Sequence, residues 1–195
     1  MRSILLTLAL GLGVLAMGQR NVTIDPAASK VSWTGKKMTG EHTGGIHIKN
    51  GTLTWSTQGL MAASVTIDMT TITCSDLEGG AATKLVNHLK SPDFFNVEAH
   101  PTATFISTKV QPIDGAAPGR PNYRVTGDLT IKGITHPITF DVLSIFDGQR
   151  VIASANLTFD RSKYDVRFGS ASFFESIGDK AISDDVQLTF DITAK

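Results

Sequence analysis

The fold of this chain is decided by SPDFFNVEAHPTATF, residues 91–105, and by GDLTIKGITHPITFDV, residues 127–142. The first stretch leads from the end of a predicted helix into a strand. The second alternates apolar and polar residues over a length that suits consecutive strands. A period of two puts the apolar side chains on one face of each strand. These stretches therefore predict a β-protein that contains one helix.

The alternation continues on both sides of these stretches. Val31 and Trp33 alternate with polar residues, as do Ile46 and Ile48, and the segment 186–192 repeats the pattern near the end of the chain. About eight or nine strands are expected, many joined by short turns. One-sided alternation over consecutive strands favours an antiparallel sheet that is closed on itself or folded into a sandwich. Closure would also remove aggregation-prone edges.

Two local signals refine this layout. Asn50-Gly51 lies between two alternating runs, and this dipeptide is typical of a two-residue hairpin turn. In residues 79–90 the apolar residues instead fall on one helical face, Ser75 and Glu78 have the spacing of a capping box, and Pro92 ends the helix by Ser91. The sequence thus predicts a hairpin at 50–51 and a helix at 79–90.

The first 18 residues have the pattern of a secretory signal peptide. Arg2 precedes an apolar run at residues 4–15, and Ala16-Met17-Gly18 places small residues before a cleavage point at Gln19. The run is shorter than the roughly 20 apolar residues that span a bilayer. We therefore expect a signal peptide at 1–18, one domain at 19–195, no stable membrane insertion after cleavage, and a periplasmic or secreted location. An uncleaved N-terminal anchor is the alternative.

Charge and cysteine content exclude several classes of protein. Residues 19–195 contain 17 basic and 18 acidic residues with no block of one sign, which gives no electrostatic support for a nucleic-acid or anionic-membrane partner. Cys74 is the single cysteine, so an exported form has no internal disulfide. A buried thiol that acts as a small apolar side chain is the main reading of Cys74.

Four blocks together resemble the YceI-like family of secreted, lipocalin-like barrels that bind polyisoprenoids. They are LKSPDFFNV at residues 89–97 with the following HP and ATF, GDLTIKGIT at 127–135, FDRSKYDV at 159–166, and IGD at 177–179 followed by the closing strand. The resemblance implies an all-β fold with one short helix, an eight-stranded antiparallel barrel with the helix near its mouth. It also implies an apolar tunnel for an isoprenoid lipid, such as an isoprenoid quinone or a polyprenyl phosphate. No other cofactor is implied, and the family analogy allows a homodimer.

Apolar residues that the strand pattern turns inward, together with the helix face and the aromatic residues, are the expected tunnel wall. They are Val31, Trp33, Ile46, Ile48, Leu85, Leu89, Phe94, Phe95, Phe105, Phe140, Phe168 and Phe173. The same aromatic residues would also suit ordinary core packing. An eight-stranded barrel has an interior wide enough for side chains or for one small ligand, so both readings stay open.

Polar candidates are few. Arg161 and Arg167 can fork onto a phosphate head group, although a salt-bridged strand end that fixes the barrel rim explains them better. The five histidines form no tight metal-ligand pattern, and no catalytic motif is present, so neither a metal nor catalytic residues are expected. The leading hypothesis is non-enzymatic lipid binding. Its alternatives are a stress-associated barrel without a ligand, and an enzyme or redox helper that acts on a bound quinone.

Overall fold

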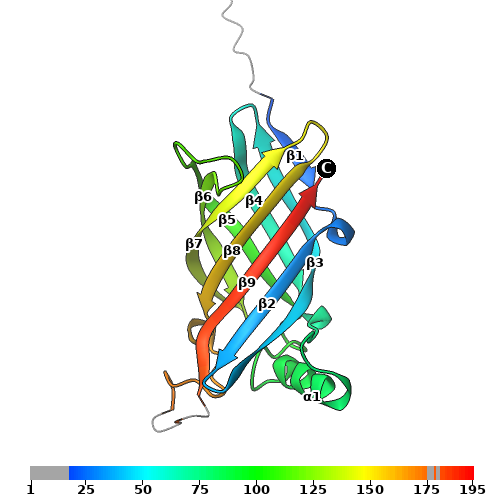
Figure 1. Ribbon diagram of the computed structural model, residues 1–195, viewed down its shortest axis with the longest axis vertical. Coiled ribbons are helices and arrows are strands. Elements are labelled where there is room, and N and C mark those ends of the chain that lie inside the picture. Colours follow the sequence, from blue (N-terminus) through cyan, green and yellow to red (C-terminus); the bar gives the residue numbers. More distant parts are fainter. Residues whose placement is uncertain (1–17, 175–177, 179–180) are drawn as a thin grey trace, which may run out of the picture.

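The computed structural model describes residues 18–174, 178 and 181–195, so almost all of the expected signal peptide lies outside the described part. The described chain is mostly β-strand, with one α-helix and three short 3-10 helices (Figure 1). The elements are β1 Arg20–Thr23, η1 Pro26–Ala28, β2 Lys30–Lys37, β3 Gly40–Ser56, β4 Gly59–Asp68, η2 Met69–Thr71, α1 Gly79–Lys90, β5 Thr102–Pro112, β6 Tyr123–Ile131, β7 Ile134–Phe146, β8 Val151–Asp160, η3 Arg161–Tyr164 and β9 Ile182–Ala194.

The strands form one antiparallel sheet that closes into a barrel. The order is β1-β3-β2-β9-β8-β7-β6-β5-β4, and an additional pairing of β3 with β4 closes the ring. Eight strands, β2 to β9, make the barrel, while the short β1 is added along the far half of β3, where Arg20 lies opposite Trp55. The predicted eight-stranded antiparallel barrel with one helix is confirmed.

The expected hairpin at Asn50-Gly51 is wrong. β3 runs through this dipeptide as one strand of 17 residues, and only a register shift between Ile48 and Asn50 marks the place. A Cβ on Gly51 would lie 2.6 Å from the side chain of Ile24 and 2.6 Å from the carbonyl oxygen of Ser64. This glycine therefore permits a close approach of neighbouring segments, and it does not form a turn.

Helix α1 has the predicted bounds but not the predicted cap. Glu78 is itself the N-cap residue, and its side chain makes no capping hydrogen bond. His88 and Lys90 lie in the last turn, where positive charge interacts favourably with the helix dipole. After α1 the chain turns tightly, with the amide of Val97 donating to the carbonyl of Lys90 at 2.9 Å. The turn holds Phe94 against the end of the barrel.

The two ends of the barrel differ. At the end remote from α1 (Figure 1), Val22, Ile24 and Val151 are buried, and Ile24 bridges to Ala194. Trp55 packs edge-on against Tyr123, with ring centroids 6.2 Å apart, which fills this end with side chains. The end next to α1 is formed by the β2–β3 hairpin, the segment after β8 and the helix. The barrel is therefore packed at one end and carries its helix at the other.

Candidate functional site

The barrel encloses a cavity of about 240 Å³, measured as the space open to the centres of water-sized spheres. Every strand from β2 to β9 contributes to its wall, and so do α1 and the turn that follows it. Almost all lining side chains are apolar. The polar exceptions are Lys36, Lys37, His42, Thr104, Arg161 and Ser183. Such a wall offers no set of hydrogen-bond partners that would hold ordered water, and it favours an apolar occupant.

The structure brings together ten of the twelve residues that were predicted to line a tunnel. The ten are Val31, Trp33, Ile46, Ile48, Leu85, Leu89, Phe94, Phe95, Phe105 and Phe140. Phe168 and Phe173 do not line the cavity. They lie in the segment after η3, and they are 43% and 41% exposed. Aromatic character alone therefore did not separate wall residues from rim residues, since these two residues belong to no alternating strand.

Other wall residues were not among the predicted site residues. They are mainly apolar residues of β4, β6, β8 and β9, including Leu60, Ala63, Val65, Ile67, Val125, Leu129, Ala153, Leu157, Val186, Leu188 and Phe190. Except for Leu60, which a register shift in the β3–β4 pairing puts out of phase with Ala63, each occupies an alternate position in its strand, so the period-two signal was present in the sequence. What the sequence did not supply was the register that brings these residues to a common space.

Gly127 of β6 shapes the interior next to Phe105. A Cβ at this position would lie 2.5 Å from the Phe105 ring. The register also shifts on β5 between Ser107 and Lys109, opposite this glycine. The missing side chain thus leaves room for the ring, which packs 5.3 Å from Phe140, measured between centroids.

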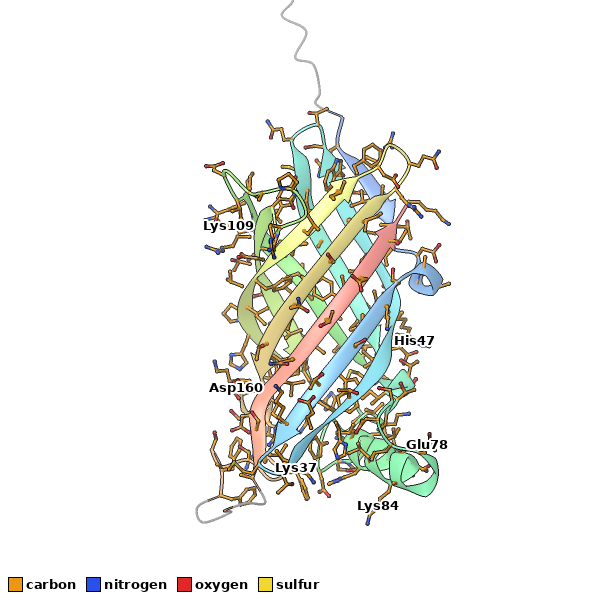
Figure 2. The ribbon with its side chains drawn as sticks, in the orientation of Figure 1. Lys37, His47, Glu78, Lys84, Lys109 and Asp160 are labelled. Atoms are coloured by element: carbon orange, nitrogen blue, oxygen red, sulfur yellow. The ribbon has the colours of Figure 1, made fainter. Side chains whose placement is uncertain are left out.

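The mouth of the cavity lies at the α1 end. Lys36 and Lys37, at the end of β2, are exposed and still line the cavity, so the space reaches the surface there. Figure 2 shows Lys37 at this end of the barrel, near helix α1, which carries Lys84 and is preceded by Glu78. The polar lining residues, Thr104 excepted, come from this end.

One polar pair is built into the mouth. The His42 ring donates through Nδ1 to Asp76 at 2.8 Å, and the amide of Thr43 donates to the other carboxylate oxygen at 2.8 Å. The hydrogen bond from His42, followed by that from Thr43, lowers the pKa of Asp76 from 3.8 to about 2. The carboxylate is therefore ionised at neutral pH, and the pair fixes His42 beside the opening.

Arg161 is a buried structural link at the rim. Its side chain is 1% exposed, and its guanidinium donates to four backbone carbonyls, those of Ser183, Val166, Phe168 and Ile182, at 2.9–3.0 Å. An ion pair with Asp184 adds to these contacts at 3.1 Å. The link ties the segment after β8 to the start of β9.

Burial also affects the charge of this group. Desolvation lowers the pKa of the Arg161 guanidinium, and the carboxylates of Asp184 and Asp160 oppose that shift. Asp184 is itself fixed, because the hydroxyl groups of Ser170 and Ser172 donate to its other oxygen at 2.8 and 2.6 Å. The hydrogen-bond donors of Arg161 are thus occupied by the protein itself. This is the geometry expected of a residue that fixes the barrel rim, and not of one that binds a phosphate head group.

Arg167 lies outside the cavity wall. Its Nε donates to Asp165, and its guanidinium carbon lies 5.0 Å from the centroid of the Phe173 ring. The side chain is 60% exposed. A head group that leaves the mouth would meet Lys36, Lys37 and His42 in the lining, whereas Arg167 is not part of it.

Two further findings concern the described residues. Within residues 18–174, 178 and 181–195, no group of three or more His, Cys, Asp or Glu side chains is placed to hold a metal ion. None of the helices that the structure describes is long and apolar enough to cross a bilayer.

Comparison with known proteins gives a consistent family. The model of the YceI-like domain matches residues 22–194. A UPF0312 protein of Pseudomonas putida is 33% identical over 100 residues, which are 51% of this chain and 46% of that protein. A UPF0312 protein of Staphylococcus epidermidis is 36% identical over 92 residues, 44% of this chain and 48% of that one. In both cases the match spans less than half of the relative's own length.

Solved structures show the same barrel. BcnA of Burkholderia cenocepacia superimposes with a TM-score of 0.67 at 26% identity, covering 88% of this chain and 99% of that one. A polyisoprenoid binding domain from Saccharophagus degradans gives a TM-score of 0.61 at 17% identity, covering 89% and 97%. The second identity supports a likeness of fold alone. With the family model matching nearly all of the described barrel, the chain belongs to the YceI-like family.

Proposed function

We propose that this protein binds an isoprenoid lipid, with the prenyl chain in the barrel cavity and the polar head at the α1 end, and that it does so without catalysis. The observation that carries the proposal is an enclosed, apolar cavity that opens to the surface beside polar side chains. An amphiphile with one long apolar chain matches that arrangement. The polyisoprenoid binding domain of Saccharophagus degradans, which shares the fold, supports the same ligand class.

The size of the cavity sets the length of chain that fits. One water-sized sphere occupies about 10–15 Å³, so a cavity of 240 Å³ accommodates on the order of 20 water-sized groups. A prenyl unit has five carbons, so roughly three to five units fit inside. Longer chains must extend beyond the cavity.

Binding energy follows from the same count. Each buried CH₂ contributes about 0.8 kcal/mol, so a prenyl unit contributes about 4 kcal/mol before costs. Association costs about 4–15 kcal/mol in lost freedom. Chains of one or two units are therefore expected to bind weakly, and chains of three or more units tightly.

The packed barrel without a ligand is the main alternative, and the open cavity counts against it. An enzyme that acts on a bound quinone would need reactive groups that converge on the occupant. The His42–Asp76 pair is the nearest such arrangement, and it lies at the mouth and not along the chain site. A periplasmic or secreted location is part of the proposal, and it rests on the signal-peptide pattern of residues 1–18.

The first experiment is mass spectrometry of organic extracts from the purified, folded protein. We expect a prenyl lipid in stoichiometric amount, and the mass would identify its chain and head group. A parallel titration with farnesol and geranylgeraniol covers a host that lacks the natural ligand. A folded protein that contains no prenyl lipid and binds neither alcohol would refute the proposal.

Two adjacent alanines of β4 supply a matched pair of variants. Ala63 lines the cavity and Ala62 does not, because neighbouring strand residues point to opposite faces. Ala63→Phe fills space needed for about one prenyl unit, so geranylgeraniol affinity is expected to fall about tenfold or more, at 1.4 kcal/mol per factor of ten. Ala62→Phe adds the same ring outside and should leave affinity unchanged.

A further inference from the structure

The barrel is incompletely paired between β7 and β8. These strands contain 13 and 10 residues, yet their pairing runs only from Val142 opposite Ala155 to Phe146 opposite Val151. Beyond Val142, β7 continues along β6 as far as Ile134, and β8 continues along β9 as far as Asp160. The two strands therefore separate over residues 134–141 and 156–160.

The hairpin that joins β6 to β7 shows which backbone groups face this seam. Lys132 and Gly133 both have positive φ, which gives a two-residue turn that pairs Ile131 with Ile134. Hydrogen-bonded pairs then recur at every second residue. In β7 the residues between them, Thr135, Pro137, Thr139 and Asp141, direct their N–H and C=O groups away from β6.

Pro137 agrees with this alternation. Proline has no N–H, so within a sheet it is tolerated where that group would face an open side. If the β7–β8 register continued, Asp141 would lie opposite Asn156, and Thr139 opposite Thr158. Among the described residues these positions have no such pairing. A stretch of sheet edge is thus open on both sides of the seam.

Side chains close the seam where hydrogen bonds do not. Phe140, Leu157 and Phe190 line the internal cavity, and the same three residues also line a groove on the outer surface over β7, β8 and β9. The rings of Phe140 and Phe190 meet edge to face, with centroids 5.7 Å apart. These three residues are the ones that the lining of the cavity and the lining of the groove have in common.

The seam is bounded at the α1 end as well. There η3 bridges to β7, with a ring nitrogen of His136 lying 3.0 Å from the carbonyl oxygen of Lys163. Lys132 donates to the carbonyl of Asp165 at 2.6 Å. The unpaired stretch, residues 134–141 and 156–160, is therefore bounded by the β7–β8 pairing at one end and by the η3 contacts at the α1 end. It is a window in the barrel wall and not a frayed strand end.

We propose that this window is a lateral gate, through which the tail of the bound prenyl chain passes when Phe140, Leu157 and Phe190 move aside. The proposal rests on the lipid-binding function above. Opening needs three side chains to change rotamer and breaks no strand pairing, because none exists there among the described residues. A chain longer than the cavity then has an exit besides the α1 mouth.

Leu157 and Leu188 allow a matched test, because they are cross-strand partners in β8 and β9. Both line the cavity, but only Leu157 also lines the outer groove. A gate residue controls passage, so its truncation should raise the association rate as well as the dissociation rate. A wall residue holds the bound chain, so its truncation should mainly raise the dissociation rate.

The measurement is stopped-flow exchange of a fluorescent prenyl alcohol longer than the roughly three to five units that fit in the cavity, on wild type, Leu157→Ala and Leu188→Ala. In Leu157→Ala we expect the association rate to rise roughly tenfold and the dissociation rate to rise by at least as much, because Leu157 also lines the cavity. Leu188→Ala should weaken binding through the dissociation rate alone. Leu157→Phe places a larger side chain in the gate, so it should slow both rates. This variant also provides a test if Leu157→Ala folds poorly.

Hydrogen exchange on the wild type gives a second readout. The amides of Thr139, Asp141, Asn156 and Thr158 should exchange fast, and those of Leu143 and Ser154, which are paired, slowly. Equal protection at the two sets, or matching kinetics for Leu157→Ala and Leu188→Ala, would overturn the gate and leave lipid binding intact. A wild type that binds no prenyl alcohol would instead refute the proposed function.

Discussion

Replacement of Arg161 by methionine should cost about 3–5 kcal/mol of unfolding free energy. The side chain is 1% exposed and donates to four backbone carbonyls in two segments that meet at the mouth. Hydrogen bonds from a charged group are worth about 1.5–3 kcal/mol each, but the losses do not add, because removing the guanidinium also ends its own desolvation. Breaking a buried ionic contact typically costs about 3–5 kcal/mol, which we take as the net value.

Urea unfolding measures this loss. With a slope of about 2 kcal/mol per M, the midpoint should fall by roughly 2 M in Arg161→Met. Arg161→Lys keeps the charge without the planar fork and should fall in between. Arg124→Met is the matched control, because its pair with Asp141 is largely exposed and such pairs are worth about 0–1 kcal/mol.

Equal midpoint shifts in Arg161→Met and Arg124→Met would refute the structural reasoning. The head-group hypothesis makes a different prediction for the same residue. If Arg161 held a phosphate head group, folded Arg161→Lys protein would lose affinity for a prenyl phosphate while keeping its affinity for the prenyl alcohol. With its donors already occupied by carbonyls, we expect both affinities to change alike.

Two further predictions follow from single contacts. Gly44→Ala should cost about 1–3 kcal/mol in urea unfolding, because a Cβ would clash with the carbonyl oxygen of Thr73, whereas Gly35→Ala, with only a 4.0 Å contact, should be milder. Equal losses would contradict the geometry. Asp76, whose folded pKa is lowered from 3.8 to about 2 by His42, contributes stability above pH 3.8 that is lost as the pH falls toward 2. Asp76→Asn should show a weaker dependence of the urea midpoint on pH over that window, and an unchanged dependence would exclude the contribution.

Alternation in the sequence predicted the strands and much of the cavity wall, because a strand buried on one side repeats every second residue. It failed at Asn50-Gly51, where the same dipeptide that forms a hairpin turn lies within a long strand. Local turn propensity is overridden there, since Gly51 is required by the neighbouring Ile24 and Ser64. Long-range contacts of this kind leave no local signal.

The segment after η3, at the rim of the barrel, was predicted least well, because local sequence patterns again do not show how it packs. Phe168 and Phe173 lie outside any strand or helix, so neither period could show which way they point. The β7–β8 seam was likewise invisible, because both strands alternate normally and only their register reveals where pairing stops. Pro137 was a sign in the sequence that part of β7 lacks a partner strand, because proline has no N–H to donate. That sign can be interpreted only once it is known which neighbouring strand the backbone of Pro137 faces.

An open interior has a cost that the rest of the barrel must offset. At about 24 cal/mol per Å³ of cavity, a cavity of 240 Å³ lowers the free energy of unfolding by on the order of 5 kcal/mol. This loss is a large part of a typical folding free energy. The compensating contacts lie at the ends, in the packed cluster around Trp55 and Tyr123 and in the Arg161 link. Because the wall itself is left under-packed, an occupant both fills the space and stabilises the fold. Ligand binding should therefore raise the melting temperature of the wild type more than that of Ala63→Phe, whose interior is already partly filled.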